Sequence, residues 1–137
     1  MSMVERFFYC DRNPASAGLE VMPDLPIMLR HRSSALMSTG LVDSGAMINI
    51  LPYSLGIQLG LAWSEHKRRI PLGGYLARIE ARGVVVHATV GQLPEVRLSF
   101  AWAESDQAPL LLGQFNFFEE FEVRFVRAQR FFEISRA

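Results

Sequence analysis

Two neighbouring segments alternate apolar and polar side chains with a period of two residues, and this pattern constrains the fold more than any other feature of the sequence. Their apolar positions are Val84, Val86, Ala88 and Val90 in the first segment and Val96, Leu98, Phe100 and Trp102 in the second. Successive side chains of a β-strand point to opposite faces, so each segment is predicted to form a strand with one buried face.

Shorter strand signals fill most of the remaining chain. They are predicted at 7–10, 40–46 and 110–113, with hairpins over 27–37 and 123–134 and a hairpin tip at Gly73-Gly74. Residues 52–61 are predicted to form a helix, because proline suits a first turn and Leu55 and Leu59 keep helical spacing. A short helix is also predicted within 114–121. Many short strands with one or two short helices indicate an all-β domain, either a compact barrel or a sandwich.

Size and charge restrict the domain and its partners. The chain has 137 residues, with 14 Lys and Arg against 14 Asp and Glu, so we expect one domain without the positive field that attracts nucleic acid. No apolar run reaches the ~18 residues that would indicate a membrane span, and no secretory signal is evident. The single cysteine, Cys10, cannot form an internal disulfide, which suits the cytoplasm. We expect an N-terminal strand and loop over 1–25 and the main domain over 26–137.

Several motifs of cofactor and metal binding are missing from the sequence. It contains no glycine-rich phosphate loop and no zinc-binding helix with paired histidines. The three histidines, His31, His66 and His87, lie far apart, and none has a second ligand type beside it at metal-binding spacing. We therefore expect neither a metal nor a cofactor.

The sequence Asp43-Ser44-Gly45 is the strongest candidate for a functional site. An apolar run, Leu41-Val42, precedes it and a second, Ile48 to Leu51, follows it. A carboxylate so close to the core loses part of its hydration, which requires a compensating interaction or a function. The tripeptide also suits an ordinary Asx-type turn with a purely structural role.

Two motifs in this order resemble the retropepsin-like aspartic protease family. Residues 41–46, continuing through 49–52, resemble the active-site turn of that family, and Leu110-Leu111-Leu112-Gly113 resembles its apolar-apolar-glycine element. Between them, Pro71 to Tyr75 occupies the place of the family's glycine-containing flap hairpin. The resemblance spans about residues 26–134, nearly the whole chain. It implies the closed β barrel of a single-lobe acid protease.

The resemblance also implies roles for the residues of the turn. Asp43 would be the catalytic carboxylate, and the Ser44 hydroxyl would lock two such turns together across a dimer. Gly45 would let the backbone approach the substrate, while Ala46 would leave room for a substrate side chain. The element Leu112-Gly113 would pack beneath the turn and keep it rigid.

Further residues are expected to contact the substrate. In such a fold the flap, with Leu72, Gly73, Gly74 and Tyr75, would close over an extended polypeptide that adds to the protein as a strand. Met47 stands where the family usually has a small polar or acidic residue, and its thioether is a poor hydrogen-bond acceptor.

Acid-protease chemistry requires two neighbouring carboxylates that share a proton, and a chain of this length can supply one such lobe. The resemblance therefore implies a twofold symmetric homodimer in which Asp43 of each subunit meets at the axis. The expected activity is that of an aspartic endopeptidase. A non-catalytic dimer that binds peptides or partners is the alternative, favoured by Met47, and a plain β-domain with a structural turn is the third.

Overall fold

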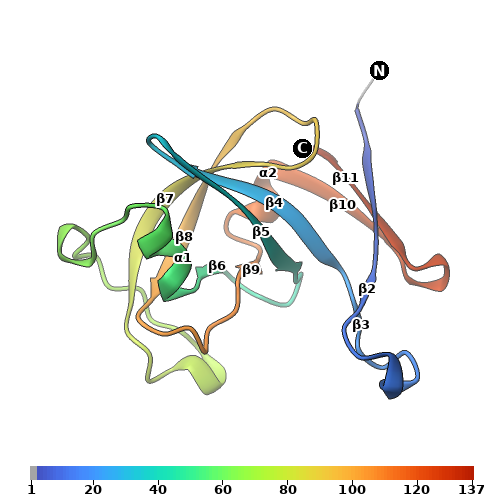
Figure 1. The fold of residues 1–137 in the computed structure, drawn as a ribbon, viewed down its shortest axis with the longest axis horizontal. Helices are drawn as coiled ribbons and strands as arrows, with labels where there is room; N and C mark the ends of the chain where they lie inside the picture. Colours follow the sequence, from blue (N-terminus) through green and yellow to red (C-terminus); the bar gives the residue numbers. More distant parts are fainter. Residues whose placement is uncertain (1–2) are drawn as a thin grey trace.

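The structure is a computed structural model that describes residues 3–137, and its main part is a closed six-stranded β barrel (Figure 1). In barrel order the strands are β4 (Asp24–His31), β5 (Ser34–Val42), β9 (Leu111–Leu112), β6 (Asn49–Leu51), β8 (Val96–Ala103) and β7 (Ala81–Thr89). Two short α-helices accompany it, α1 (Tyr53–Gln58) and α2 (Phe117–Glu120). The prediction of an all-β closed barrel with short helices is confirmed.

The long antiparallel pair β7–β8 follows from the period-two pattern. Its register places Val84 opposite Phe100 and Val86 opposite Leu98. These side chains are buried in the barrel interior with the inward residues of β4, which are Leu25, Ile27 and Leu29. The opposite face of the pair carries Gly83 and Val85 and is only partly covered. One face of these two strands thus builds the core, and the other can pack against further segments of the chain or bind a ligand.

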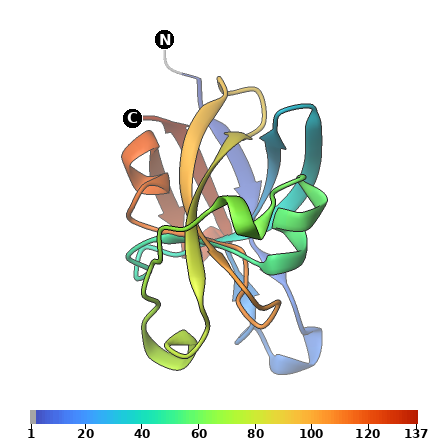
Figure 2. The same ribbon diagram turned by 90° about the vertical axis from the view of Figure 1, so that its left-hand side faces the viewer.

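A three-stranded sheet of both chain ends lies beside the barrel (Figures 1 and 2). Strand β11 (Phe131–Arg136) is its centre, with β1 (Glu5–Phe8) on one side and β10 (Phe121–Val126) on the other. The short helix η4 (Arg127–Gln129) joins β10 to β11, as the predicted terminal hairpin requires. Phe132 and Ile134 are fully buried and attach this sheet to the core.

The N-terminal segment departs in detail from the single strand predicted at 7–10. Instead of one strand there are two, β1 and the two-residue strand β2 (Cys10–Asp11), and Tyr9 lies between them. The Tyr9 amide donates to the Arg130 carbonyl. Strand β2 pairs with β3 (Val21–Met22), and the helix η1 (Pro14–Ser16) lies in the connection. Within residues 3–137, no helix combines the length and the apolar character needed to cross a membrane.

Helix α1 is shorter than the predicted 52–61. Pro52 lies at the N-cap, and the helix ends at Gln58 because Gly60 adopts a left-handed conformation with φ of 82°. The Gly60 amide then donates to the Ile57 carbonyl, which closes the last turn. Gly56, an unfavourable residue inside a helix, is buried where any Cβ would collide with the Trp102 ring. Close packing against that indole explains the glycine.

The predicted hairpin tip at Gly73-Gly74 is wrong. Residues 70–80, here called the flap loop, contain a short helix η3 (Gly74–Leu76), preceded along the chain by η2 (Trp63–Glu65). The Leu76 amide donates to the Gly73 carbonyl, so local bonds replace cross-strand pairs. Strand-like pairing occurs only at the base of the loop, where the Ile70 amide donates to the Ala81 carbonyl. Leu72 and Leu76 are both buried, and a tight hairpin with its tip at the two glycines would not place both against the sheet.

Candidate active site

Asp43 follows directly on the last residue of β5. The end of this strand pairs in parallel with β9, Leu41 opposite Leu111 and Val42 opposite Leu112. The Asp43 amide continues the ladder by donating to the Leu112 carbonyl at 3.0 Å. Asp43 is thereby held at the point where a buried strand reaches the surface, and it is half-buried.

Backbone hydrogen bonds define the turn after Asp43. One carboxylate oxygen, Oδ1, accepts from the Gly45 amide at 2.9 Å, and the Ala46 amide donates to the Asp43 carbonyl at 3.1 Å. Ser44 and Gly45 are exposed, while Ala46 is half-buried. The Asx-type turn is therefore present, and it leaves the second carboxylate oxygen, Oδ2, without a bond to the turn.

The segment after β9 holds the turn from beneath. The Gln114 amide donates to the Ala46 carbonyl at 2.8 Å, and the Gln114 side-chain amide donates to the Ser44 carbonyl at 2.7 Å. Gly113 lies so close that a Cβ there would stand 2.5 Å from the Ile48 carbonyl oxygen and 2.7 Å from that of Ala46. Only glycine permits this approach of two backbones.

Asn49 is a supporting residue that the sequence reasoning missed. It is fully buried, and its side-chain oxygen accepts from the Gly113 amide at 2.8 Å. Its side-chain amide donates to the Ser99 carbonyl and to the Asn116 side chain. One polar residue inside the apolar run 48–51 was the available signal, because a buried amide needs partners. The network ties β6, β8 and β9 together behind the turn.

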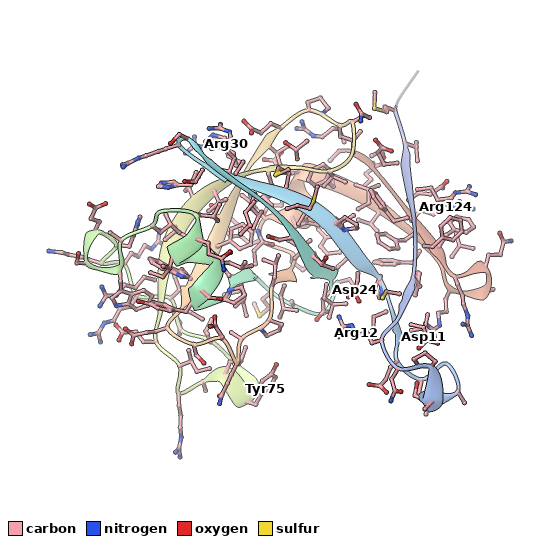
Figure 3. The ribbon with its side chains drawn as sticks, viewed as in Figure 1. Asp11, Arg12, Asp24, Arg30, Tyr75 and Arg124 are labelled. Carbon is pink, nitrogen blue, oxygen red and sulfur yellow. The ribbon has the colours of Figure 1, made fainter. Side chains whose placement is uncertain are left out.

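Asp43 opens onto a cleft of about 520 Å³ that it shares with the flap loop. Leu41, Leu110 and Leu111 form apolar parts of its wall, and Tyr75 lies at its edge. The Tyr75 side chain is 83% exposed and extends from η3 at the lower edge of the molecule (Figure 3). The cleft thus combines a carboxylate, an apolar wall and a projecting aromatic side chain.

The other predicted substrate-contacting residues divide into two groups. Met47 is 80% exposed beside the turn, and Gly73 and Gly74 have no other atoms near their Cβ positions. Leu72 instead lies in a second apolar cluster, with Leu76, against the outer face of β7 and β8. Its side chain anchors the flap loop and does not reach toward the cleft.

A second carboxylate, Asp24, lines the same cleft but is already engaged. The Arg12 guanidinium binds it with two hydrogen bonds, one of them 2.9 Å from Nε (Figure 3). The hydrogen bond to Asp24 raises the pKa of Arg12. Asp24 is therefore held by a bidentate partner, whereas the Asp43 carboxylate, among residues 3–137, accepts only from the Gly45 amide of its own turn.

A smaller hollow of about 330 Å³ lies on another side of Asp43. Met22, Pro23 and Phe125 line it together with Asp43 and Ser44. Phe125 stands on the outer strand β10 and is 40% exposed. Within residues 3–137, no three His, Cys, Asp or Glu side chains lie close enough together to hold a metal ion.

Comparison with known proteins gives a fold without a sequence relative. No protein-family model matches the sequence, and no characterised protein matches it in sequence. In structure it matches a retropepsin-like aspartic protease from Rickettsia conorii with a TM-score of 0.64 and 16% identity, over 99% of this chain and 94% of that chain. The chain has the retropepsin-like fold. The EIAV protease complexed with the inhibitor HBY-793 also matches, with a TM-score of 0.52 and 18% identity over 70% of this chain and 85% of that chain.

The retropepsin-like fold was predicted from the two motifs, and it is confirmed. The structure places Asp43 and Tyr75 on one cleft and brings Gly113 against Ala46. Leu72 lies in the apolar cluster away from that cleft, and the lining of the cleft also lacks Met47, Gly73 and Gly74. The roles of these residues in substrate binding and catalysis are a matter of proposal.

Proposed function

We propose that this retropepsin-like protein is an aspartic endopeptidase that acts as a homodimer. The observation that carries the proposal is the placement of Asp43, half-buried in the lining of a cleft that Tyr75 also lines. The turn that holds it is fixed by β9, Gly113 and Asn49, so the carboxylate is preorganised.

The proposed chemistry needs a second carboxylate close to the first. One ionised carboxylate takes a proton from a water molecule that attacks the peptide carbonyl, and a protonated partner donates to the carbonyl oxygen. Asp24 is unsuited to this task because Arg12 occupies it. The second carboxylate is therefore assigned to Asp43 of a second copy, and the hollow at Ser44 and Phe125 offers a surface for that copy.

The proposed substrate is an extended polypeptide. It would lie between the turn and the flap loop, where Tyr75 and Met47 offer exposed side chains and Gly73 and Gly74 leave backbone accessible. The loop would close over bound substrate and exclude water. A chain with one cysteine, Cys10, suits a reducing compartment, so cytoplasmic polypeptides are the proposed substrates.

Met47 favours a second candidate function. Its exposed thioether lies beside the turn, where an acceptor would bind the substrate backbone, and sulfur accepts hydrogen bonds weakly. A non-catalytic dimer that binds extended peptides would retain the cleft without needing that contact. The Asp43 carboxylate favours the enzyme, because its Oδ2 is left without a bond to the turn and a binding module has no need of such a group in the cleft.

One comparison tests the proposal. Wild-type protein and the Asp43→Asn variant are incubated with a broad peptide mixture from about pH 4 to about pH 7, where a carboxylate pair that shares a proton is active. We expect wild type to cleave and the variant to lose at least about a hundredfold in rate. Asp106→Asn, an exposed substitution outside the cleft, serves as the matched control. Cleavage that persists in Asp43→Asn contradicts the assignment, and binding without cleavage by wild type supports the second candidate.

A further inference from the structure

The face of β7 and β8 that points away from the barrel core is apolar, and the flap loop covers only part of it. Near the loop, Ala81 lies opposite Ala103, and Leu72 and Leu76 pack over this pair. The next pairs along the same face are Gly83 with Ala101 and Val85 with Ser99. The apolar surface continues past the point where the flap loop ends.

That uncovered part forms a groove of about 490 Å³, here called the outer groove. Its floor carries the small residues Gly83, Ser99 and Ala101 and, at one end, the exposed Val85. Ile70 stands on one side, and Ile48 and Phe115 stand on the other. A Cβ on Gly83 would have Ile70 as its nearest neighbour, at 3.6 Å, so the floor has room for a larger side chain. Phe115 is 52% exposed, which leaves an apolar wall open to a ligand.

The rim of the outer groove carries a cation, Arg68. His66 and Arg68 precede Ile70 at spacings of two residues and line the same groove. Within residues 3–137, no carboxylate forms an ion pair with Arg68. Its neighbour Arg69 lines a different hollow and pairs with Glu80 at 3.3 Å. The rim therefore offers an unengaged cation beside an apolar slot.

Among residues 3–137, the outer groove and the cleft at Asp43 share no lining residue, but the same two chain segments contribute to both. Ile48 follows Met47 at the end of the catalytic turn, and Ile70 leads into the flap loop that carries Tyr75. The two segments that bound the cleft are thus the two that bound the groove. A polypeptide extended between turn and flap loop would leave the cleft over the outer groove.

We propose that the outer groove binds a large apolar side chain of the polypeptide substrate, remote from the cleaved bond, next to an acidic side chain that pairs with Arg68. The inference rests on the proposed function and adds a substrate class to it, extended segments with adjacent apolar and acidic residues. Binding energy from such a remote contact can be used at the reacting bond. The apolar walls and the space above Gly83 favour an apolar substrate side chain, and the unpaired guanidinium of Arg68 favours an acidic neighbour.

Binding to a catalytically blocked protein provides the test. Two short fluorescein-labelled peptides contain one phenylalanine in a glycine and serine background and differ only in its two neighbours, both glutamate or both lysine. Fluorescence anisotropy measures their affinity for the Asp43→Asn variant. We expect the glutamate peptide to bind about three- to tenfold more tightly than the lysine peptide, the range of an exposed ion pair with added apolar contact.

Three further substitutions in the Asp43→Asn background assign this binding to the outer groove. Gly83→Val fills the floor and should weaken both peptides about tenfold, whereas Arg68→Glu should remove or invert the preference for glutamate. Lys67→Glu makes the same charge change one residue away, outside the groove lining, and should leave both affinities within about twofold. Thermal unfolding checks that each variant is folded.

Several results would overturn the inference. They are binding of neither peptide, equal effects of Arg68→Glu and Lys67→Glu, and unchanged binding by folded Gly83→Val. Self-association that Gly83→Val abolishes would also overturn it, because a second copy would then be the occupant.

The proposed function can fail independently of the groove. If wild type cleaves nothing while the peptides respond as expected, the groove is supported and the peptidase is wrong. If wild type cleaves and Gly83→Val alters neither peptide binding nor KM, the groove is wrong and the peptidase is supported.

Discussion

At the scale of single residues, Gly113 shows how an ordinary-looking glycine can determine a site. The residue is buried directly after β9 and against the Asp43 turn, and its amide donates to the side-chain oxygen of Asn49. Carbonyl oxygens of Ala46 and Ile48 occupy the space where a side chain would be. The turn that holds Asp43 therefore depends on the absence of one Cβ.

Gly113→Ala is expected to destabilise the protein by about 1–3 kcal/mol, because the new methyl group must displace backbone atoms in a packed region. Urea unfolding measures the loss, and peptide cleavage should fall as Asp43 moves. The matched control is Gly73→Ala in the flap loop, where a Cβ meets no atom within 4 Å and φ is −100°. That control should change stability by less than about 0.5 kcal/mol. Equal stability of the two variants would show that the packing around Gly113 is looser than described.

At the scale of elements, the terminal sheet is held on its outer side by one carboxylate. Glu133 on β11 binds Arg6 of β1 at 2.8 Å and Arg124 of β10 at 2.7 Å. The Arg6 guanidinium also lies 4.0 Å from the centre of the Phe131 ring. Three strands from the two ends of the chain are thus joined by side chains as well as by their backbone ladder.

This arrangement predicts a loss of stability in acid. Hydrogen bonds from Arg6 and then Arg124 lower the pKa of Glu133 below its ordinary value of 4.5. Because the carboxyl group binds its proton less readily in the folded chain, the ionised form stabilises the sheet above pH 4.5. That contribution is lost as the pH falls through the lowered, folded-state pKa.

Urea unfolding of wild type and Glu133→Gln, followed as the pH falls through this range, measures the contribution. We expect wild type to lose more of its free energy of unfolding in acid than the variant, which has no carboxyl group to titrate at this position. Glu122→Gln, on β10 and without an ion pair among residues 3–137, should follow the wild-type curve. Parallel pH curves for wild type and Glu133→Gln would contradict the assigned role.

At the scale of the whole molecule, the proposed site is complete only in a dimer. Phe125 is the exposed aromatic residue in the hollow that Asp43 and Ser44 share, so we place it at the proposed interface. Phe125→Asp should raise the dimer dissociation constant about tenfold or more, since burial of an aromatic side chain contributes about 1.5–3 kcal/mol. Sedimentation velocity across a concentration series measures the change, and cleavage per chain should fall in parallel.

The control for this prediction is Met37→Asp on β5, which exposes the same charge on another surface of the barrel. It should leave the dissociation constant near that of wild type. A wild type that stays monomeric at micromolar concentration, yet cleaves peptides, would contradict the shared site itself.

Much of the fold could be predicted because its signals are local. Alternation at 84–90 and 96–102 predicted β7 and β8, and the two motifs predicted the retropepsin-like fold. The flap hairpin was wrong because burial of Leu72 and Leu76 outweighed the turn preference of two glycines. Asn49 was missed because its partners, Ser99, Gly113 and Asn116, are distant in sequence. Long-range hydrogen bonds leave no periodic signal.

The sequence by itself determined the strand periodicity and the turn with Asp43, because each depends on the conformational limits of a few adjacent residues. Only the tertiary structure decided what surrounds that turn. It paired Asp24 with Arg12, brought Tyr75 to the cleft that Asp43 lines and left the outer groove open beside Arg68. These depend on which distant segments come together, and that choice follows from burial of the whole core at once.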